Sequence, residues 1–598
     1  MTSDLANLVD KAEDIGVVGS PSSTSDLKID ILGRAADKRL VGSMAVMKYS
    51  QDGHPNYALG QITEVFLYNP FVMDPTMRSI IRQRGSVEPI TERQDTHNAD
   101  MLISAVFEEN GTGLDPSSFS TVPSTGSRIK MISQDIVNRL VLPYSKEISH
   151  IGKVYGTDIL LPNLFRHFGS EREGGLGEAM HIGIFGKSGS GKSFLAKMIL
   201  TSYMRHKQMT LLVVDPQGEF SKMKNDSELM SFIQDKLGRK IEFYDLSKLV
   251  LLPDIELFKQ ILVKAQFLKD LGIKNPDNQV DGAEQIAKIL NHEWGHAAGS
   301  SYTAKVSLWD AHKRDVFDHV WERLMHTTVR NGQPIPVVIE RIYSTPSYRD
   351  KVFGDMQNIT ANPERLDAVY KKWKKIASLF GRDGMAAKDN LAAILKAIGE
   401  RGEGRIIIIN LSEAVVPDYL FWNEEIKKVS INQILQRIAD VAKEQYVAGG
   451  ALNSLVVLDE AHEFAPRERT DVEETIELRS TLTTAVRETR KYNLGWMFIS
   501  QTLSSLDRRI IEQLRMYFIG YGLAYGIELN GVRELLAGND SAIRLYQQFK
   551  DPKSSYTKPQ YSFMCIGPSS PMSFSQIPLF LNSLDYPKEF LKVNDKAG

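Results

Sequence analysis

Residues 186–193, which read GKSGSGKS, have the residue types and spacing that hold phosphate groups. They satisfy the pattern G-x-x-x-x-G-K-[ST], in which glycines permit a sharp turn and successive backbone N–H groups point at phosphates. A strand-like run, HIGIFG, leads into this loop, and a helix-like run, SFLAKMILTSYMRHK, follows it. A phosphate-binding loop is expected between a strand and a helix, because the positive N-terminal end of the helix attracts phosphate. The residues predicted to bind a nucleotide are Gly186, Lys187, Ser188, Gly189, Ser190, Gly191, Lys192, Ser193 and Phe194.

A phosphate-binding loop hydrolyses ATP only with a carboxylate for the metal and a group that orients water. The apolar run LVVL ends in Asp459 and Glu460, and parallel sheets place their ligands at such strand ends. We expect Lys192 to reach the β- and γ-phosphates, and Ser193 and Asp459 to hold Mg²⁺. Glu460 is expected to polarise the attacking water. The sequence therefore predicts an ATPase that uses ATP and Mg²⁺.

Strand-like and helix-like runs alternate around these motifs, which predicts an α/β core with a parallel sheet. TLLVVD, RIIIINL, SLVVLDE and GWMFIS are the other strand-like runs of this core. Residues 256–400 are mostly helical in pattern and interrupt it. We therefore assign the core to residues 151–255 and 401–545, with residues 256–400 as a helical insert.

The regions on either side of the core have a different character. Residues 1–25 end in the Ser/Gly/Pro-rich run GSPSSTSD, which is typical of a flexible leader. Residues 26–150 contain short β-rich runs separated by turns, which predicts a small β-barrel or sandwich without a cluster of catalytic residue types. Residues 546–598 form a Pro/Ser-rich C-terminal extension with one strand-like run, YSFMCIG.

Composition sets broad limits on the function. The chain has 598 residues and a formal charge of -2, so an overall basic surface is no evidence for nucleic-acid binding, whereas a local basic lining remains open. The single cysteine, Cys565, cannot form an internal disulfide. No run of about 18 apolar residues appears, and the N-terminus lacks the pattern of a secretory signal. We expect a cytoplasmic protein without membrane association.

Several motifs in one order resemble the HerA family, hexameric DNA-translocating ATPases of the HerA–FtsK group. The resemblance covers the β-rich region, the phosphate loop, LLVVDPQGEF with Asp215, LVVLDEAHEFAPR, and AVRETRKYNLGWMFISQTLSSLD. It implies a RecA-like core preceded by a HAS-barrel-like domain, in a six-membered ring with ATP sites between subunits. Asn493 departs from the pattern, because glycine is expected after Arg-Lys-Tyr.

The resemblance also implies roles for four further residues. Gln501 is expected to sense the γ-phosphate. Arg487 and Arg490 occupy the region that in the family reaches into the neighbouring subunit's site, where an arginine stabilises charge on the γ-phosphoryl group. Asp215 is expected to shape the surroundings of the metal.

A ring of this kind is expected to move along double-stranded DNA. HerA-family proteins occur with separate effectors, such as a nuclease or a sirtuin-like enzyme, in DNA-end processing and anti-phage defence. No nuclease motif is recognisable in the sequence, which favours a separate partner. The alternative is that the ring is mainly a scaffold that assembles and activates this effector.

Two other motif matches lead to different classes of protein. DEAH suggests a DEAH-box helicase, but the long insert between Lys192 and Asp459 argues against that architecture. HEWGH, from His292 to His296, matches the H-E-x-x-H zinc pattern. Gly295 weakens a helix there and no third ligand is evident, so we expect no zinc site.

Overall fold

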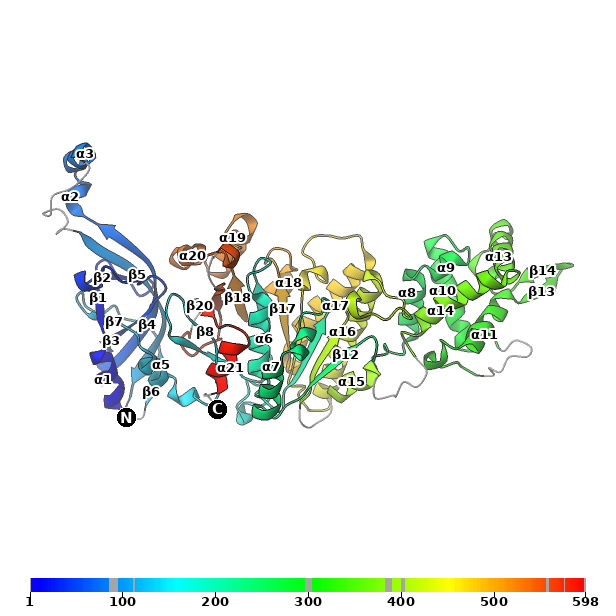
Figure 1. The fold of residues 1–598 in the computed structure, drawn as a ribbon, viewed down its shortest axis with the longest axis horizontal. Coiled ribbons are helices and arrows are strands. Elements are labelled where there is room, and N and C mark those ends of the chain that lie inside the picture. Colours follow the sequence, from blue (N-terminus) through cyan, green and yellow to red (C-terminus); the bar gives the residue numbers. More distant parts are fainter. Residues whose placement is uncertain are drawn as a thin grey trace.

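Three regions lie side by side along the long axis of the molecule: a β-barrel, a large sheet with its helices, and a group of helices (Figure 1). The computed structural model describes residues 2–84, 95–110, 113–295, 304–381, 390–398, 404–554, 559–574 and 576–595. The predicted fold class, an α/β core with a helical insert and an N-terminal barrel, is confirmed.

The N-terminal barrel is a sheet that closes on itself. Its strands follow the order β2-β1-β7-β3-β4-β5-β6, and an additional pairing of β2 with β5 closes the ring and leaves β6 at the margin. The strands of the barrel are β1 Asp14–Val18, β2 Leu27–Ile31, β3 Met44–Gln51, β4 His54–Tyr68, β5 Thr96–Glu109, β6 Leu114–Ser117 and β7 Arg128–Met131. Closure pairs the backbone N–H and C=O groups that the edge strands of an open sheet would leave unpaired. The long strands β4 and β5 extend beyond the barrel toward α2 (Pro70–Met73) and α3 (Pro75–Arg84) (Figure 1).

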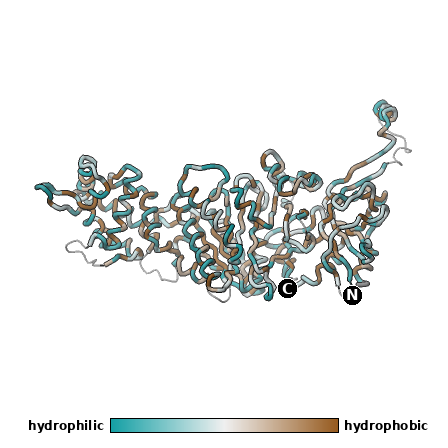
Figure 2. Tube along the Cα trace, turned by 180° about the vertical axis from the view of Figure 1, so that it is seen from behind, coloured by the Kyte–Doolittle hydropathy of each residue, from teal (hydrophilic) through white to brown (hydrophobic). Residues whose placement is uncertain are grey.

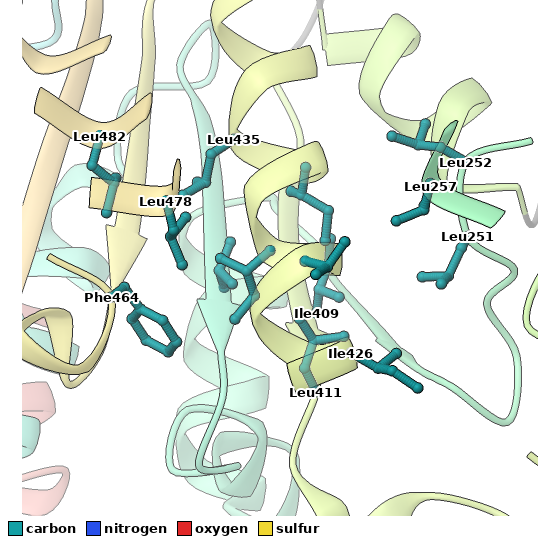
Figure 3. Close-up of a cluster of buried hydrophobic side chains, with 14 of the residues drawn as sticks. Leu251, Leu252, Leu257, Ile409, Leu411, Ile426, Leu435, Phe464, Leu478 and Leu482 are labelled. Carbon is teal, nitrogen blue, oxygen red and sulfur yellow. The ribbon is translucent and has the colours of Figure 1, made fainter. Parts of the chain in front are cut away.

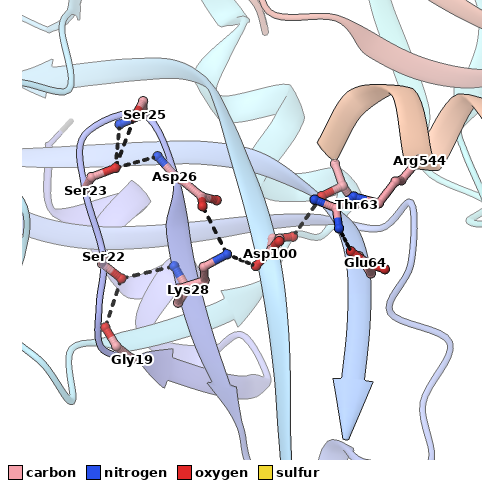
Figure 4. Close-up of polar contacts among 10 residues, drawn as sticks. All are labelled: Gly19, Ser22, Ser23, Ser25, Asp26, Lys28, Thr63, Glu64, Asp100 and Arg544. Carbon is pink, nitrogen blue, oxygen red and sulfur yellow. Dashed lines mark hydrogen bonds and ion pairs between the residues drawn. The ribbon is translucent and has the colours of Figure 1, made fainter. Parts of the chain in front are cut away.

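The expected flexible leader, residues 1–25, is instead part of the barrel. Helix α1 (Thr2–Lys11) packs against α5 (Gln134–Leu140), and β1 pairs with both β2 and β7. The Ser-rich run is the turn between β1 and β2. Ser22 Oγ donates to the Gly19 carbonyl at 2.9 Å and accepts from the Lys28 amide at 3.0 Å (Figure 4). Side-chain bonds of this kind order a short polar turn.

The large sheet has 11 strands in the order β12-β15-β11-β16-β17-β10-β18-β19-β20-β8-β9. Neighbours from β12 to β18 run parallel, and those from β18 to β9 run antiparallel. The parallel strands are β10 Ile182–Phe185, β11 Thr210–Asp215, β12 Ile241–Asp245, β15 Ile406–Asn410, β16 Ser454–Leu458, β17 Leu494–Ser500 and β18 Met516–Gly520. The antiparallel strands are β8 Ile148–Val154, β9 Leu160–Leu164, β19 Ser562–Ile566 and β20 Leu579–Ser583.

The parallel strands are short continuous apolar runs because both faces of the sheet are covered. The pleat divides each run between two cores: Ile407 and Ile409 of β15 enter one cluster, whereas Ile406 and Ile408 enter the other. Figure 3 shows part of the first cluster, where Ile409 lies near residues of the covering helices. The main helices of this region are α6 Lys192–Tyr203, α7 Ser227–Ser231, α16 Glu424–Val447, α17 Glu473–Thr489, α19 Gly526–Leu535 and α20 Asp540–Gln547.

The helical insert packs around Trp373, which is fully buried, and continues the first cluster. Its helices are α8 Ile255–Lys264, α9 Phe267–Asp270, α10 Pro276–Leu290, α11 Arg314–Met325, α12 Ile339–Ile342, α13 Pro346–Thr360, α14 Pro363–Ala377 and α15 Leu391–Ile398. A small hairpin, β13 Thr327–Arg330 and β14 Gln333–Pro336, protrudes at its far end (Figure 1). Apolar residues run through the central strands and recur on the inner sides of the helices (Figure 2). No helix in the described part of the chain is suited in length and apolar character to cross a membrane.

The C-terminal extension is built into the sheet and joins it to the barrel. Strands β19 and β20 follow β18, and helix α21 (Lys588–Asp595) contacts β8. Gln61 of the barrel, which is buried, exchanges two hydrogen bonds with the Phe580 backbone at 2.9 and 2.8 Å. Arg544 of α20 forms an ion pair with Glu64 of β4 at 3.0 Å (Figure 4). The barrel and the sheet therefore share a continuous interface.

Candidate functional site

The phosphate loop follows β10, the middle strand of the 11-stranded sheet, between the ends of β17 and β18. Gly186, Gly189 and Gly191 have φ values of 153°, 84° and 90°, which side chains rarely adopt. A Cβ atom at Gly186 would lie 2.6 Å from Ser190 Oγ, so the turn also requires glycine for space. The glycine spacing of the motif thus fixes the shape of the loop.

Lys192 is the first residue of α6 and is 8% exposed. Its Nζ donates to the Gly186 carbonyl at 2.7 Å and lies 3.3 Å from the Lys187 carbonyl, so the ammonium spans the loop. Burial lowers the pKa of Lys192, and the nearby Glu460 and Asp459 carboxylates oppose that shift. An anion on the loop would compensate the buried positive charge.

Asp459 and Glu460 follow β16 at the same edge of the sheet. Burial, with repulsion from Glu460, raises the pKa of Asp459 to about 7. Glu460 has a φ of 48°, an unusual conformation for a residue other than glycine, and its amide donates to Asp459 Oδ1 at 2.9 Å. The strained turn places two consecutive carboxylates at this edge, and the charge of each raises the pKa of Lys192 against the effect of burial.

Gln501 directly follows β17, and its Nε2 donates to Glu460 Oε1 at 3.2 Å. His462 lies on the other side of this carboxylate, with Nδ1 3.4 Å from Glu460 Oε2 and 3.3 Å from Ser500 Oγ. No role was predicted for His462, although it lies in the DEAH run. The Gln501 amide therefore hydrogen-bonds one oxygen of the Glu460 carboxylate, and the imidazole lies near the other oxygen, which has no hydrogen-bond partner among the described residues.

Asp215 ends β11, the strand beside β16, and is fully buried. Its Oδ2 accepts from the Ser221 amide at 2.8 Å and from Ser221 Oγ at 2.7 Å. Burial raises the pKa of Asp215, and its charge in turn contributes to the raised pKa of Asp459. Lys197 of α6 is also buried here, and burial lowers the pKa of its ammonium. Asp215 thus acts on Asp459 through its charge.

The residues at this edge fit a magnesium ion bound together with phosphate. Ser193 and Asp459 provide hydroxyl and carboxylate oxygens, the ligands that Mg²⁺ prefers, from the loop helix and from the end of β16. The raised pKa of Asp459 reflects burial and repulsion that a divalent cation would relieve. Ser190 Oγ is buried and has no hydrogen-bond partner within the described residues, as in a cradle made for a polar ligand.

The structure does not bring Arg487 and Arg490 to this edge within one chain. Both lie where α17 leads into β17, at the opposite edge of the sheet. The Arg490 side chain forms an ion pair with Glu178 at 3.0 Å, whereas the Arg487 side chain is 71% exposed. The two arginines therefore differ in availability to another subunit.

Residues 169–180, a glycine-rich segment before β10, pack against this arginine turn. Besides the ion pair of Glu178, the Ala179 amide donates to the Arg490 carbonyl at 3.1 Å. Asn493 has a φ of 60°, a conformation that asparagine tolerates where glycine was expected. Its Nδ2 donates to the Gly177 carbonyl at 3.2 Å, which binds the same segment.

The HEWGH motif does not lie on a helix in its described part. Helix α10 ends at Leu290, and His292 and Gly295 have φ values of 66° and 65°. His296 lies outside the described residues. Across the described ranges, no group of three or more His, Cys, Asp or Glu residues is arranged to hold a metal by itself.

Among solved structures, three similar chains are distant in sequence and have low TM-scores. VirB4 of Thermoanaerobacter pseudethanolicus is 16% identical, with a TM-score of 0.36, over 74% of this chain and 97% of that chain. The genome packaging NTPase B204 from Sulfolobus turreted icosahedral virus 2, in complex with ATP-gammaS, is 9% identical, with a TM-score of 0.27, over 67% and 96%. The pCW3 conjugation coupling protein TcpA, with ATPgS, is 11% identical, with a TM-score of 0.24, over 92% of each chain.

The central part of the chain matches the model of a known protein family. No curated protein matches the chain. Residues 179–438 match the family model described as "Helicase HerA, central domain", which spans the phosphate loop, Asp215, the helical insert and β15. Residues 179–438 therefore belong to the HerA central-domain family of P-loop NTPases, as the resemblance in the sequence predicted.

Proposed function

We propose that this protein is an ATP-hydrolysing ring motor that moves along double-stranded DNA. The observation that carries the proposal is the meeting of Lys192, Asp459, Glu460 and Gln501 at one edge of a HerA-type domain. The exposed Arg487 at the opposite edge fits a site that a neighbouring subunit completes. In a closed ring, which we propose to be a hexamer, each subunit supplies the phosphate loop of one ATP site and the arginine of the next site.

In this proposal each residue at the edge has a chemical task. The loop N–H groups and Lys192 bind the phosphates of ATP. Ser193 and Asp459 hold Mg²⁺, which neutralises charge on the phosphate oxygens when bound. Glu460 orients and deprotonates the attacking water, and Gln501, which already contacts Glu460, senses the γ-phosphate.

The same proposal includes DNA and a partner protein. Contacts to duplex phosphates bind DNA with little sequence preference and with strong dependence on salt. A separate effector, a nuclease or a sirtuin-like enzyme, would act on or beside the DNA that the ring holds. We place this assembly in DNA-end processing or anti-phage defence in the cytoplasm.

The test is the steady-state ATPase rate of the full chain without DNA, with duplex DNA and with single-stranded DNA. The proposal predicts strong stimulation by duplex DNA that falls as salt rises. Displacement of a third strand from duplex DNA should then require ATP and fail in Glu460→Gln. An ATPase that duplex DNA leaves unchanged, and that an added effector activates, would instead support a scaffold.

A further inference from the structure

A cavity of 430 Å³ lies beside the first turn of α6, next to the phosphate loop, and aromatic side chains line it. Phe194 comes from α6, whereas Tyr561 and Tyr586 come from the C-terminal extension. The ring centroid of Phe194 lies 5.9 Å from that of Tyr561 and 6.5 Å from that of Tyr586. Residues separated by more than half of the chain therefore form one aromatic group.

Phe194 is out of place for a residue with only a packing role. The rest of α6 from Leu195 to Tyr203 is buried, yet Phe194 is 42% exposed. A large apolar ring that remains partly in water forgoes part of the stabilisation that burial would give it. Tyr561 lies directly against the loop, because a Cβ atom at Gly191 would be 2.6 Å from its ring.

The charges around the cavity disfavour a second anion. Among the described residues, Lys153 is the only lysine or arginine that lines it, and its Nζ already lies 3.0 Å from Glu589 and 3.3 Å from Asp158. Asp585 adds a third carboxylate to the wall. A flat, uncharged group with polar edges suits this lining better than a phosphate or a carboxylate does.

We infer that the cavity binds the base of the nucleotide whose phosphates lie on the loop, an inference that rests on the proposed function. The base would stack on Phe194 and Tyr561, since every nucleobase has a π-face. Gln560 and Asn582 also line the cavity, and the amide of Gln560 and the amide nitrogen of Asn582 would meet the polar edge of the base. The C-terminal extension thereby becomes part of the nucleotide site.

The test compares binding of ADP with binding of inorganic tripolyphosphate, both measured calorimetrically on the full chain. Phe194→Ala and Tyr561→Ala should each weaken ADP binding about tenfold, the usual size of a lost stacking contact. Binding of tripolyphosphate should not change. Phe194→Tyr should retain ADP affinity, and Tyr561→Leu keeps volume without the ring. Tyr348→Ala, at an exposed tyrosine of the helical insert, is the matched control.

Three results would overturn the inference. Equal losses for ADP and tripolyphosphate would mean that the aromatic residues only support the loop. Unchanged ADP affinity in both alanine variants would place the base elsewhere. A wild-type protein that binds neither ligand would refute the proposed ATPase itself, whereas one that binds both equally well would refute the base site alone.

Discussion

Glu460 is the residue on which the proposed chemistry depends most. Its left-handed backbone costs about 1–3 kcal/mol, and such strain persists where surrounding contacts hold it. Gln501 and His462 supply those contacts on its two carboxylate oxygens. The geometry therefore favours a carboxylate held in one orientation for catalysis over one that simply ends a strand.

The first prediction concerns hydrolysis. Glu460→Gln should keep ATP bound while kcat falls by at least about 10²-fold, because general-base assistance is lost. Lys192→Ala should instead weaken ATP binding. Both are measured by calorimetry and by phosphate release, with Glu468→Gln as a control at an exposed acid. Turnover near the wild-type rate in Glu460→Gln would remove its assigned role.

The second prediction concerns acid stability. Burial lowers the pKa of His181 to about 4, from about 6.5 in an unfolded chain. Between these values the unfolded state binds the extra proton, so this group lowers stability as pH falls below about 6.5, by up to about 1.4 kcal/mol per pH unit. Urea midpoints at pH 7 and pH 5 should therefore differ less in His181→Gln than in the wild type. The exposed His54→Gln should match the wild type, and equal losses in all three proteins would contradict the prediction.

At the scale of elements, the turn between α17 and β17 carries the two arginines with different surroundings. Glu178 holds Arg490 within its own chain, and Arg515 lies 3.6 Å from the same carboxylate. Among the described residues, Arg487 forms an ion pair with Glu488 alone, at 4.0 Å, and its side chain is mostly exposed to solvent. We therefore propose that Arg487 acts on a neighbouring subunit's site and that Arg490 has a structural role.

The third prediction follows from this assignment. Arg487→Ala should leave ATP affinity nearly intact and lower kcat by about 10³-fold, the lower range for such arginines. Arg490→Ala should mainly lower thermal stability. Lys491→Ala, beside them on the surface, is the control. Mixing Arg487→Ala with Lys192→Ala, each inactive alone, should restore partial activity, since some interfaces pair an intact loop with an intact arginine. Mixed rings that form without regaining activity would disprove action between subunits.

The fourth prediction concerns the contact between the barrel and β20. Gln61→Leu removes the side-chain partner of the Phe580 amide and leaves a buried donor unpaired, which costs about 1–3 kcal/mol. We expect a lower melting temperature and faster hydrogen exchange in β20, with ATP affinity unchanged. Gln548→Leu, at an exposed glutamine, should show neither effect. Unchanged exchange in β20 would mean that the barrel does not stabilise this strand.

At the scale of the whole molecule, the barrel and one face of the large sheet share a single apolar cluster. Met44, Tyr57 and Phe107 of the barrel belong to the same cluster as Ile182 and Met198 of the ATPase core. Ala45 and Met47, at alternate positions of β3, belong to a second cluster made of barrel residues alone, so the shared cluster covers the other face of this strand. The barrel is thus part of the folding unit as well as a candidate surface for ring contacts.

The fifth prediction tests this continuity. A chain that starts at residue 145 should be poorly soluble and should lose ATP binding, because it exposes the shared cluster to water. Removing the small hairpin formed by β13 and β14 should be tolerated, since that hairpin protrudes from the insert. Solubility, circular dichroism and calorimetry would compare the two deletions. A folded, ATP-binding protein without the barrel would contradict the shared cluster.

The sequence by itself determined the local chemistry. The glycines at 186, 189 and 191 both define the loop and permit its shape, so one short run encodes the turn and its donors. The continuous apolar runs that end in Asp215, Asp459 and Gln501 identified buried parallel strands whose ends must meet. Hydrophobic pattern and turn preference depend on residues a few positions apart. The phosphate loop and the strand ends are features of that kind, so the sequence alone predicts them.

Only the tertiary structure decided which distant segments meet. The polar run before Lys28 looked like a linker, but its serines order a turn whose first strand closes the barrel. Tyr561 lies against the phosphate loop, and Glu178 forms an ion pair with Arg490. Both contacts result from strand order and packing, which no local sequence pattern predicts. Pairings between residues hundreds of positions apart depend on the packing of whole elements. The composition of the nucleotide site beyond its loop, and the difference between its two arginines, therefore emerged only from the folded chain.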